Sequence, residues 1–166
     1  MPSSYTVPGL QESDAATVRD ALQYRLVALL DLQLTLKHIH WNVVGANFIG
    51  VHEMLDPQHA AVSEMVDAVA ERIATLGGQP LGTPAAITEG RTWENYALNR
   101  ALTHEHLSAL DSVYIGVVED HRKAIEVSGD IDPVSEDLLI GQTNQLELFH
   151  WFVRAHLEDK KGNIES

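Results

Sequence analysis

The fold-determining part of this chain reads LKHIHWNVVGANFIGVHEMLDP over residues 36–57 and VDAVAERIATLGGQP over residues 66–80. Five potential metal ligands lie in it: His40, His52, Asp56, Asp67 and Glu71. Four of them form two pairs, each spaced by four residues, and a helix places such a pair on one face, one turn apart. Carboxylates and imidazoles without thiolates suit iron better than structural zinc.

Upstream of this segment, leucines recur at helical spacing and predict a first helix that ends near residue 43. Ser13 or Asp14 is expected to cap its start. Residues 1–12 are polar and contain two prolines, so they predict a short extended tail.

A second helix is expected over about 49–76, after a loop marked by glycines and asparagine. Gly77 and Gly78 predict its end. Pro57 lies within this span, so either the helix is kinked there or its regular part begins near the proline.

The second half of the chain predicts two further helices. Residues 77–91 are rich in Gly, Pro and Thr and predict a long connection with one short helical turn around 84–89. A third helix capped by Thr92 is expected to reach about residue 127, with Leu98 and Leu102 in its core face. Pro133 predicts the first turn of a fourth helix that runs to about residue 159.

Four helices of this length, without a strand pattern or repeats, predict an all-α four-helix bundle. The 166 residues and the hydrophobic content of 45% fit one domain over 1–166, with short tails at about 1–12 and 160–166. The longest connection lies between the second and third helices, where a short helix is expected.

Composition excludes several classes of protein. There is no cysteine, so disulfides and thiolate metal sites are excluded. The formal net charge of −13 repels nucleic acid and attracts cations, although an acidic surface can also serve solubility alone. Apolar runs are too short to span a membrane, and the N-terminus does not read as a signal peptide, so a cytoplasmic location is expected.

The five ligands cannot meet within one chain. Asp56 and Asp67 are eleven residues apart, which is roughly 16 Å along a helix, whereas direct bonds to a metal are about 2.0–2.2 Å long. Two copies of the second helix, packed antiparallel across a twofold axis, would bring opposite ends together. Ala60 and Ala61 lie at the midpoint and are small enough for close approach of the helices.

In this arrangement one chain contributes an upstream half-site and its mate contributes a downstream half-site. The upstream half-site comprises His40, His52 and Asp56, with His40 folded back by the loop. The downstream half-site comprises Asp67 and Glu71. The alternative is that each pair of side chains only forms a solvated helix face.

The same residues resemble the Dps family of mini-ferritins, most closely its actinobacterial type. The family pattern of His-Trp, a short Asn-Phe loop, His-x-x-x-Asp and Asp-x-x-x-Glu-Arg is matched at these positions: His40-Trp41, Asn47-Phe48, His52 with Asp56, and Asp67 with Glu71-Arg72. The resemblance implies a ferritin-like four-helix bundle with a short helix in the connection between helices 2 and 3.

The resemblance also implies a function. It implies a homo-dodecamer of tetrahedral symmetry with a ferroxidase centre in which iron (Fe2+/Fe3+) occupies a dinuclear site shared between two subunits. Fe(II) would be oxidised, preferably by hydrogen peroxide, and stored as ferric mineral, which protects against oxidative damage. Trp41 would relay electrons beside the site or pack at the interface. Only one Glu-x-x-His motif occurs, at Glu147 and His150, which favours a site between subunits over one inside the bundle.

Four acids open the fourth helix: Asp130, Asp132, Glu136 and Asp137. Relatives have acidic iron-entry pores near this position, and Asp137 is the best candidate because it precedes the LLI stretch as a pore acid does in relatives. The alternative role is a favourable interaction with the N-terminal helix dipole.

Many members of the family bind DNA through lysine-rich tails, from which this chain departs. No Lys or Arg precedes Arg19, and Lys160 and Lys161 stand among acids. DNA binding is therefore expected to be weak or absent. Two alternatives remain: a DNA-compacting nucleoid protein with secondary metal binding, and a helical scaffold without redox turnover.

Overall fold

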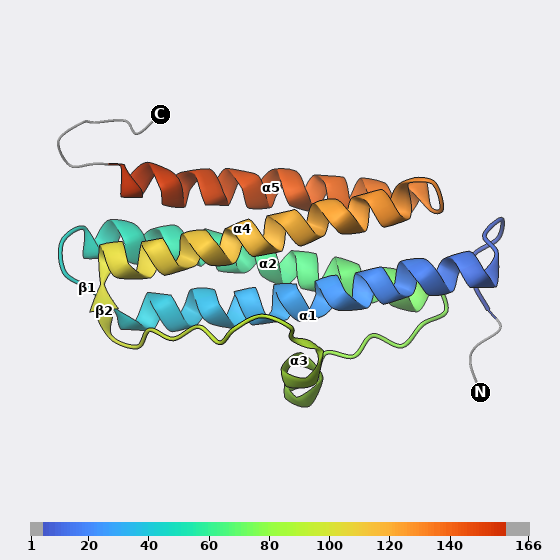
Figure 1. Cartoon of the computed structure of the whole chain (residues 1–166), viewed down its shortest axis with the longest axis horizontal. Coiled ribbons are helices and arrows are strands. Elements are labelled where there is room, and N and C mark those ends of the chain that lie inside the picture. Colours follow the sequence, from blue (N-terminus) through green and yellow to red (C-terminus); the bar gives the residue numbers. More distant parts are fainter. Residues whose placement is uncertain (1–4, 159–166) are drawn as a thin grey trace.

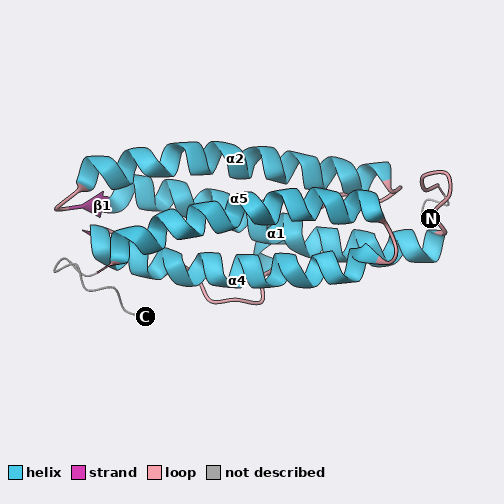
Figure 2. Cartoon of the chain, turned by 90° about the horizontal axis from the view of Figure 1, so that it is seen from above, coloured by secondary structure: helices cyan, strands magenta, loops and turns pink. Residues whose placement is uncertain are grey.

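Five helices and two very short strands make up the computed structural model, which describes residues 5–158. In chain order they are α1 (Glu12–Asn42), β1 (Val43–Val44), α2 (Phe48–Thr75), α3 (Pro84–Gly90), β2 (Ala101–Leu102), α4 (Thr103–Gly129) and α5 (Pro133–Leu157). The four long helices form a bundle (Figures 1 and 2), and α3 lies outside it against α1 (Figure 1). The predicted all-α bundle with a short helix in the long connection is confirmed.

The bundle is built from two helix hairpins. α1 packs mainly on α2, and α4 packs mainly on α5. Leucines of α1 at helical spacing are fully buried between the hairpins: Leu22, Leu26, Leu29, Leu32 and Leu36. Each such side chain contributes about 1.5–3 kcal/mol by leaving water, so the apolar repeat that predicts α1 also explains its central place.

The ends of α2 follow from backbone chemistry. Asn47 precedes the helix with a positive φ of 61°, and Gly77 follows it with a φ of 81°, where L side chains other than Asn are disfavoured. The predicted end of this helix is therefore confirmed. The alternative that regular helix begins near Pro57 is wrong, because α2 begins at Phe48 and continues through the proline. The predicted cap of α1 is also wrong, since Gln11 occupies that position and its side chain makes no capping bond.

The predicted third helix begins too early, because residues 91–100 are not helical and α4 starts at Thr103. Contacts with α1 hold this segment extended. The Trp93 indole N–H donates to Asp31 over 2.7 Å, and a ring nitrogen of His38 lies 2.7 Å from the Leu98 carbonyl oxygen. Such tertiary contacts outweigh local helix propensity.

The same segment leads into a strand pair that the sequence pattern does not predict. Val43 pairs with Ala101 and Val44 pairs with Leu102 in a parallel register. Leu102 is consequently 45% exposed rather than a core residue, and Leu98 is half-buried. Glu105 accepts a bond from the Leu102 N–H over 2.9 Å, which helps to start α4 at Thr103. Within residues 5–158, no helix is long and apolar enough to cross a membrane.

Candidate metal centre

The structure brings the two predicted histidine ligands into direct contact. His40 lies in the last turn of α1, and His52 lies in the second turn of α2, across the loop that contains Asn47. Their rings stack with centroids 3.6 Å apart. Nδ1 of each ring donates to the backbone carbonyl oxygen of the other histidine, both over 2.9 Å.

This reciprocal bonding determines which ring atoms remain available. A carbonyl oxygen only accepts hydrogen bonds, so Nδ1 carries the proton in both His40 and His52. Nε2 of each neutral ring then keeps its lone pair, and neither Nε2 has a hydrogen-bond partner in the described part of the chain. A backbone carbonyl that orients a histidine in this way is a common support for metal ligation.

Asp56 completes the upstream half-site one turn further along α2. Its Oδ1 lies 3.3 Å from His40 Nδ1 and 2.6 Å from the Lys37 ammonium. The hydrogen bond from Lys37 lowers the pKa of Asp56, so the carboxylate is ionised at neutral pH. Lys37 was not singled out from the sequence, although its position three residues before His40 places it on the same side of α1.

The downstream half-site is open to solvent. Asp67 and Glu71 are both exposed on α2, and neither carboxylate has a hydrogen bond or ion pair within residues 5–158. In the same range, no group of three or more His, Asp and Glu side chains is arranged to hold a metal ion. One copy of the chain thus offers two imidazole nitrogens and a carboxylate already bonded to Lys37.

The surface beside the half-sites exposes large apolar side chains. On α1, Leu34 is 61% exposed and Trp41 is 72% exposed, and Ile49 at the start of α2 is 58% exposed. Ala60, at the midpoint between the half-sites, is also exposed. Several exposed apolar side chains on one pair of helices are typical of a surface that another protein covers.

The acidic segment at the α4–α5 turn divides into structural and free carboxylates. Asp132 is buried and accepts a hydrogen bond from Arg72 Nη2 over 2.7 Å and another from the Ser135 hydroxyl. Burial raises the pKa of Asp132, but the bonds from Ser135 and Arg72 outweigh it, so the pKa is lowered. Asp132 therefore joins α5 to α2 and is poorly placed to serve as a pore acid.

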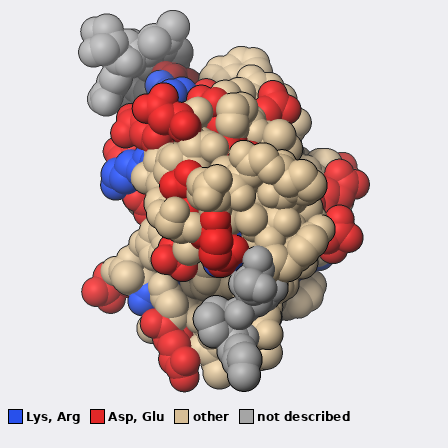
Figure 3. All heavy atoms as spheres, turned by 90° about the vertical axis from the view of Figure 1, so that its right-hand side faces the viewer, with Lys and Arg blue, Asp and Glu red and all other residues tan. Residues whose placement is uncertain are grey.

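The other candidate pore acids remain accessible. Asp130 and Asp137 are exposed, and Glu136 is half-buried with its carboxylate beside Gly129. Acidic side chains dominate over basic ones on the end of the bundle that includes the α4–α5 turn (Figure 3). This field favours cations there and opposes phosphate groups.

The lone Glu-x-x-His motif does not form a site. Glu147 accepts from Arg122, whereas His150 Nε2 lies 2.7 Å from Asp111. Of the other histidines, His121 is fully buried, and burial lowers its pKa to about 4, so it stays neutral inside the bundle. These contacts agree with packing roles for Glu147, His150 and His121.

Comparisons with known proteins extend over nearly the whole chain. The ferritin-like domain family matches residues 19–162. A curated relative named "DNA protection during starvation protein", from Mycolicibacterium smegmatis, is 57% identical over 98% of this chain and 88% of its own. The "Fine tangled pili major subunit" of Haemophilus ducreyi is 48% identical over 98% of this chain and 86% of its own. Among solved structures, "DpsA14 from Streptomyces coelicolor" superposes with a TM-score of 0.95 at 55% identity, over 100% of this chain and 99% of the other.

Proposed function

Because this chain belongs to the Dps family of ferritin-like proteins, we propose that it is a ferroxidase that oxidises Fe(II) at sites shared by two subunits and stores the ferric product in a cage. The observation that supports this best is the His40–His52 pair. Both rings present an unpaired Nε2, and both are oriented by backbone carbonyls beside Asp56. Such an arrangement suits a divalent transition metal.

The chain's residues have distinct roles in this proposal. The two imidazoles and the Asp56 carboxylate bind Fe(II), and the bonds from Nδ1 to the carbonyl oxygens hold the rings in place. The Lys37 ammonium bonds Asp56 Oδ1, so it competes with a ferrous ion for the negative charge of this carboxylate. Asp67 and Glu71 of a second copy supply the remaining carboxylates.

Two ferrous ions at one shared site match the chemistry of hydrogen peroxide. Two Fe(II) together give up two electrons, and with two protons these convert one peroxide into two water molecules. Reducing peroxide by one electron would instead release a hydroxyl radical. Trp41, exposed beside His40, either relays electrons or packs against the second copy.

The inference that two chains share one site rests on the length of α2 and on the exposed side chains beside the half-sites. Asp56 and Asp67 are eleven residues apart on one continuous helix, roughly 16 Å, so a helix bend cannot bring them to one metal. An antiparallel copy of α2 brings the downstream half-site of one chain to the upstream half-site of the other. Exposed Ala60 allows close approach at the midpoint, and exposed Leu34 and Trp41 supply apolar area for the interface.

Mixing two inactive variants tests the sharing directly. One variant carries His40→Ala and His52→Ala, and the other carries Asp67→Ala and Glu71→Ala. Each homodimer has two broken sites, whereas a mixed dimer has one intact site and one doubly broken site. After unfolding and random reassembly, about a quarter of the wild-type rate of iron oxidation should return, because half of the dimers are mixed.

A control variant, Glu64→Ala, removes an exposed acid of α2 that belongs to neither half-site and should keep full activity. Sites contained in one chain would give no recovery on mixing, because every chain in the mixture carries a broken site. Failure of both single preparations to lose activity would refute the assignment of the ligands.

We also propose a dodecameric cage with tetrahedral symmetry and a cytoplasmic location. Iron would enter through acidic pores in which Asp137 and Asp130 take part, with Glu136 nearby. Removing the acid at residue 137 with Asp137→Asn should slow mineral formation inside the cage more than it slows binding at the dinuclear sites. Analytical ultracentrifugation gives the subunit number.

DNA binding should be weak at physiological salt. The net charge of −13 opposes contact with phosphates, and Lys160 and Lys161 lie outside the described residues. A mobility-shift assay with plasmid at about 150 mM salt measures this, because salt at that level already weakens phosphate contacts. Strong retention of plasmid there would favour the DNA-compacting alternative.

A further inference from the structure

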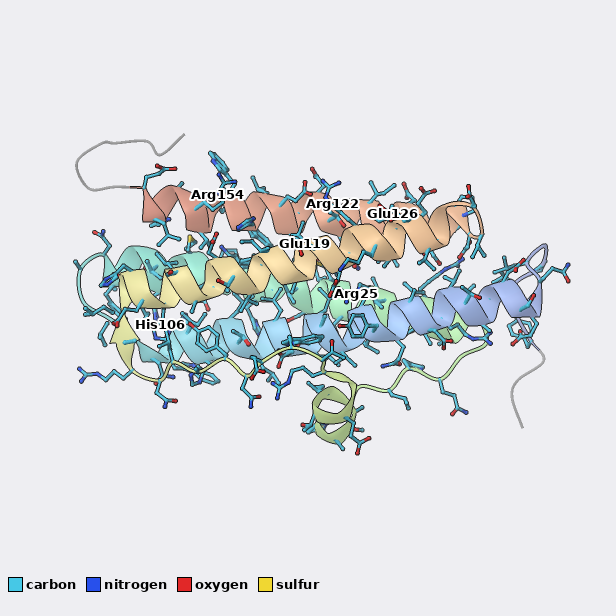
Figure 4. The ribbon with its side chains drawn as sticks, in the orientation of Figure 1. Arg25, His106, Glu119, Arg122, Glu126 and Arg154 are labelled. Atoms are coloured by element: carbon cyan, nitrogen blue, oxygen red, sulfur yellow. The ribbon has the colours of Figure 1, made fainter. Side chains whose placement is uncertain are left out.

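A network of buried polar side chains crosses the core of the bundle and joins its four long helices. Nη1 of Arg25 in α1 lies 3.4 Å from Nδ1 of His121 in α4, and Nε2 of His121 lies 3.3 Å from Oε1 of Gln142 in α5. Gln142 in turn donates to the Met65 carbonyl oxygen of α2 over 3.2 Å. All three side chains are buried, and Figure 4 shows Arg25 between α1 and α4. None of the candidate metal ligands belongs to this network.

The directions of these hydrogen bonds determine where the proton of His121 lies. A carbonyl oxygen only accepts, so the amide nitrogen of Gln142 faces Met65 and the amide oxygen faces His121. Nε2 of His121 therefore carries the ring proton and donates to Gln142. Nδ1 of the neutral ring then has only a lone pair, which accepts from the guanidinium of Arg25. This contact is a hydrogen bond only as long as His121 stays neutral.

Arg25 is a cation that the core does not fully pair. The side chain is 1% exposed, and a guanidinium keeps its charge at any ordinary pH. The nearest carboxylate oxygen is Oδ2 of Asp120, 3.5 Å from Nη2, and Nη2 makes no hydrogen bond. Asp120 also pairs with Lys123 over 2.8 Å. The lone pair of His121 is consequently an important acceptor for this buried charge.

The other helices place no carboxylate against His121. α1 contributes Arg25 and α5 contributes the neutral amide of Gln142. Within residues 5–158, no titratable side chain of α2 faces the ring, and the one acid near it is Asp120, the preceding residue of α4. Because Asp120 is already shared by two cations, little negative charge remains to stabilise a protonated ring.

A second proton on His121 goes to Nδ1. There it can be donated to the Val117 carbonyl oxygen, 3.1 Å away, but Arg25 loses its acceptor and faces an imidazolium instead. Like charges in contact and out of water repel strongly. Burial, followed by the charge of Arg25, lowers the pKa of His121 to about 4. The folded bundle therefore stays unprotonated at this ring over a range of pH in which an ordinary histidine binds a proton.

We propose that the Arg25–His121 contact is an acid-operated release, which loosens the α1–α2 hairpin from the α4–α5 hairpin when His121 takes up a proton. α1 and α4 are the helices through which the two hairpins mainly meet. Protonation turns the one side-chain hydrogen bond that joins them in this network into a repulsion. The release is independent of the proposed iron chemistry.

The sign of the pH dependence follows from the two pKa values of His121. The ordinary value of 6.5 applies to the unfolded chain, and the folded value is about 4. Below pH 6.5 the unfolded state binds a proton that the folded state does not, so the free energy of unfolding falls as the pH falls. The loss ends near pH 4, where the folded state is protonated as well.

Urea denaturation of the assembled protein between about pH 7 and about pH 4.5 tests the proposal. His121→Gln keeps a polar side chain that does not titrate. Over this range the equilibrium constant for unfolding should rise about 50-fold more in wild type than in His121→Gln, the factor that the two pKa values give. All other titrating groups are the same in both proteins, so their contributions cancel. Protein concentration is held constant, because assembly also stabilises the fold.

The matched control is His104→Gln, which makes the same change at an exposed histidine of α4. It should keep the pH dependence of wild type. Arg25→Met tests the other half of the contact. It removes the repelling cation, so the rise in the unfolding constant in acid should be smaller than in wild type, whatever the stability at neutral pH. This variant also serves if His121→Gln does not fold.

Two results would overturn the proposal. The first is the same pH dependence in wild type and His121→Gln, because the proton taken up in acid would then bind elsewhere. The second is a pH dependence in Arg25→Met that equals or exceeds that of wild type, because the guanidinium would then have no part in excluding the proton.

Discussion

The two ends of α2 present their candidate ligands in different ways. At the Phe48 end, His52 is locked to His40 by two reciprocal hydrogen bonds, and Asp56 is bonded to Lys37. At the other end, Asp67 and Glu71 extend into solvent without a partner in residues 5–158. The upstream half-site is therefore ordered by its own chain, while the downstream half-site has to be ordered by something else.

This difference has a consequence for the order of metal binding. Ligands that are already held in place lose little freedom when a metal binds, whereas exposed carboxylates lose side-chain entropy. The upstream half-site should consequently hold the first and tighter ferrous ion. The downstream carboxylates should contribute mainly to the second.

The largest predicted effect comes from removing both oriented imidazole rings of the upstream half-site. The double substitution His40→Ala, His52→Ala should weaken the tighter metal site at least about 100-fold, since even supporting partners of ligands are worth about 10–100-fold. Equilibrium titration with Co(II), a stand-in for Fe(II), measures the affinity. Circular dichroism checks that the helices remain, and an unchanged affinity in a folded variant would contradict the assignment.

The downstream end of α2 is held to α5 by the Arg72–Asp132 pair, next to Glu71. Arg72→Met should lower the free energy of unfolding by about 3 kcal/mol, because it leaves the Asp132 carboxylate buried without its cation. Urea denaturation gives the value. Arg122→Met removes an exposed ion pair with Glu147 and should cost less than about 1 kcal/mol; equal losses for the two variants would refute the structural role of Asp132.

The Arg72–Asp132 ion pair predicts that the free energy of unfolding depends on pH. The pKa of Asp132 is lowered in the folded protein below its ordinary value of 3.8, so the ionised carboxylate stabilises the fold above that pH. This contribution is lost as the pH falls through the lowered pKa. Wild type should therefore be more stable than Asp132→Asn at pH 7, and the difference should shrink at pH values below 3.8; a difference that grows in acid would show the opposite sign.

The smallest predicted effect on metal affinity concerns Lys37. Its ammonium forms an ion pair with Asp56 of the upstream half-site, and the downstream half-site has no such partner in residues 5–158. Lys37→Met should tighten binding of the first metal about two- to fivefold, because an exposed ion pair is worth about 0.2–1 kcal/mol. The Co(II) titration measures this as well. Arg19→Met, which removes a cation far along α1, is the control, and weaker metal binding in Lys37→Met would show that the lysine supports the site.

Much of the fold was predictable because its signals are local. Leucines at helical spacing, Gly77 after α2 and Pro133 at the start of α5 each act over a few residues of chain. The segment 91–100 was not predictable, since its helical pattern is overcome by bonds to α1 residues about sixty positions away, such as the bond from Trp93 to Asp31. The two-residue strand pair depends on the same long-range approach.

The candidate metal site likewise has features that the sequence predicts and features that it does not. Spacing alone indicates five candidate ligands and shows that one chain cannot bring all of them to one metal, since a helix rises about 1.5 Å per residue. Spacing does not reveal that Asp132 is bonded to Arg72, or that Lys37 lies on Asp56. Those pairings join side chains of different helices.

The sequence by itself thus indicates most of the helices, the five candidate ligands and the separation that keeps them from meeting within one chain, because periodicity and rise per residue are properties of the local chain. Only the tertiary structure decides the tautomers of His40 and His52 and the structural use of Asp132. The physical reason is that hydrogen bonds and packing act through space over a few ångströms. They depend on which helices the fold brings together, which no short stretch of the sequence specifies.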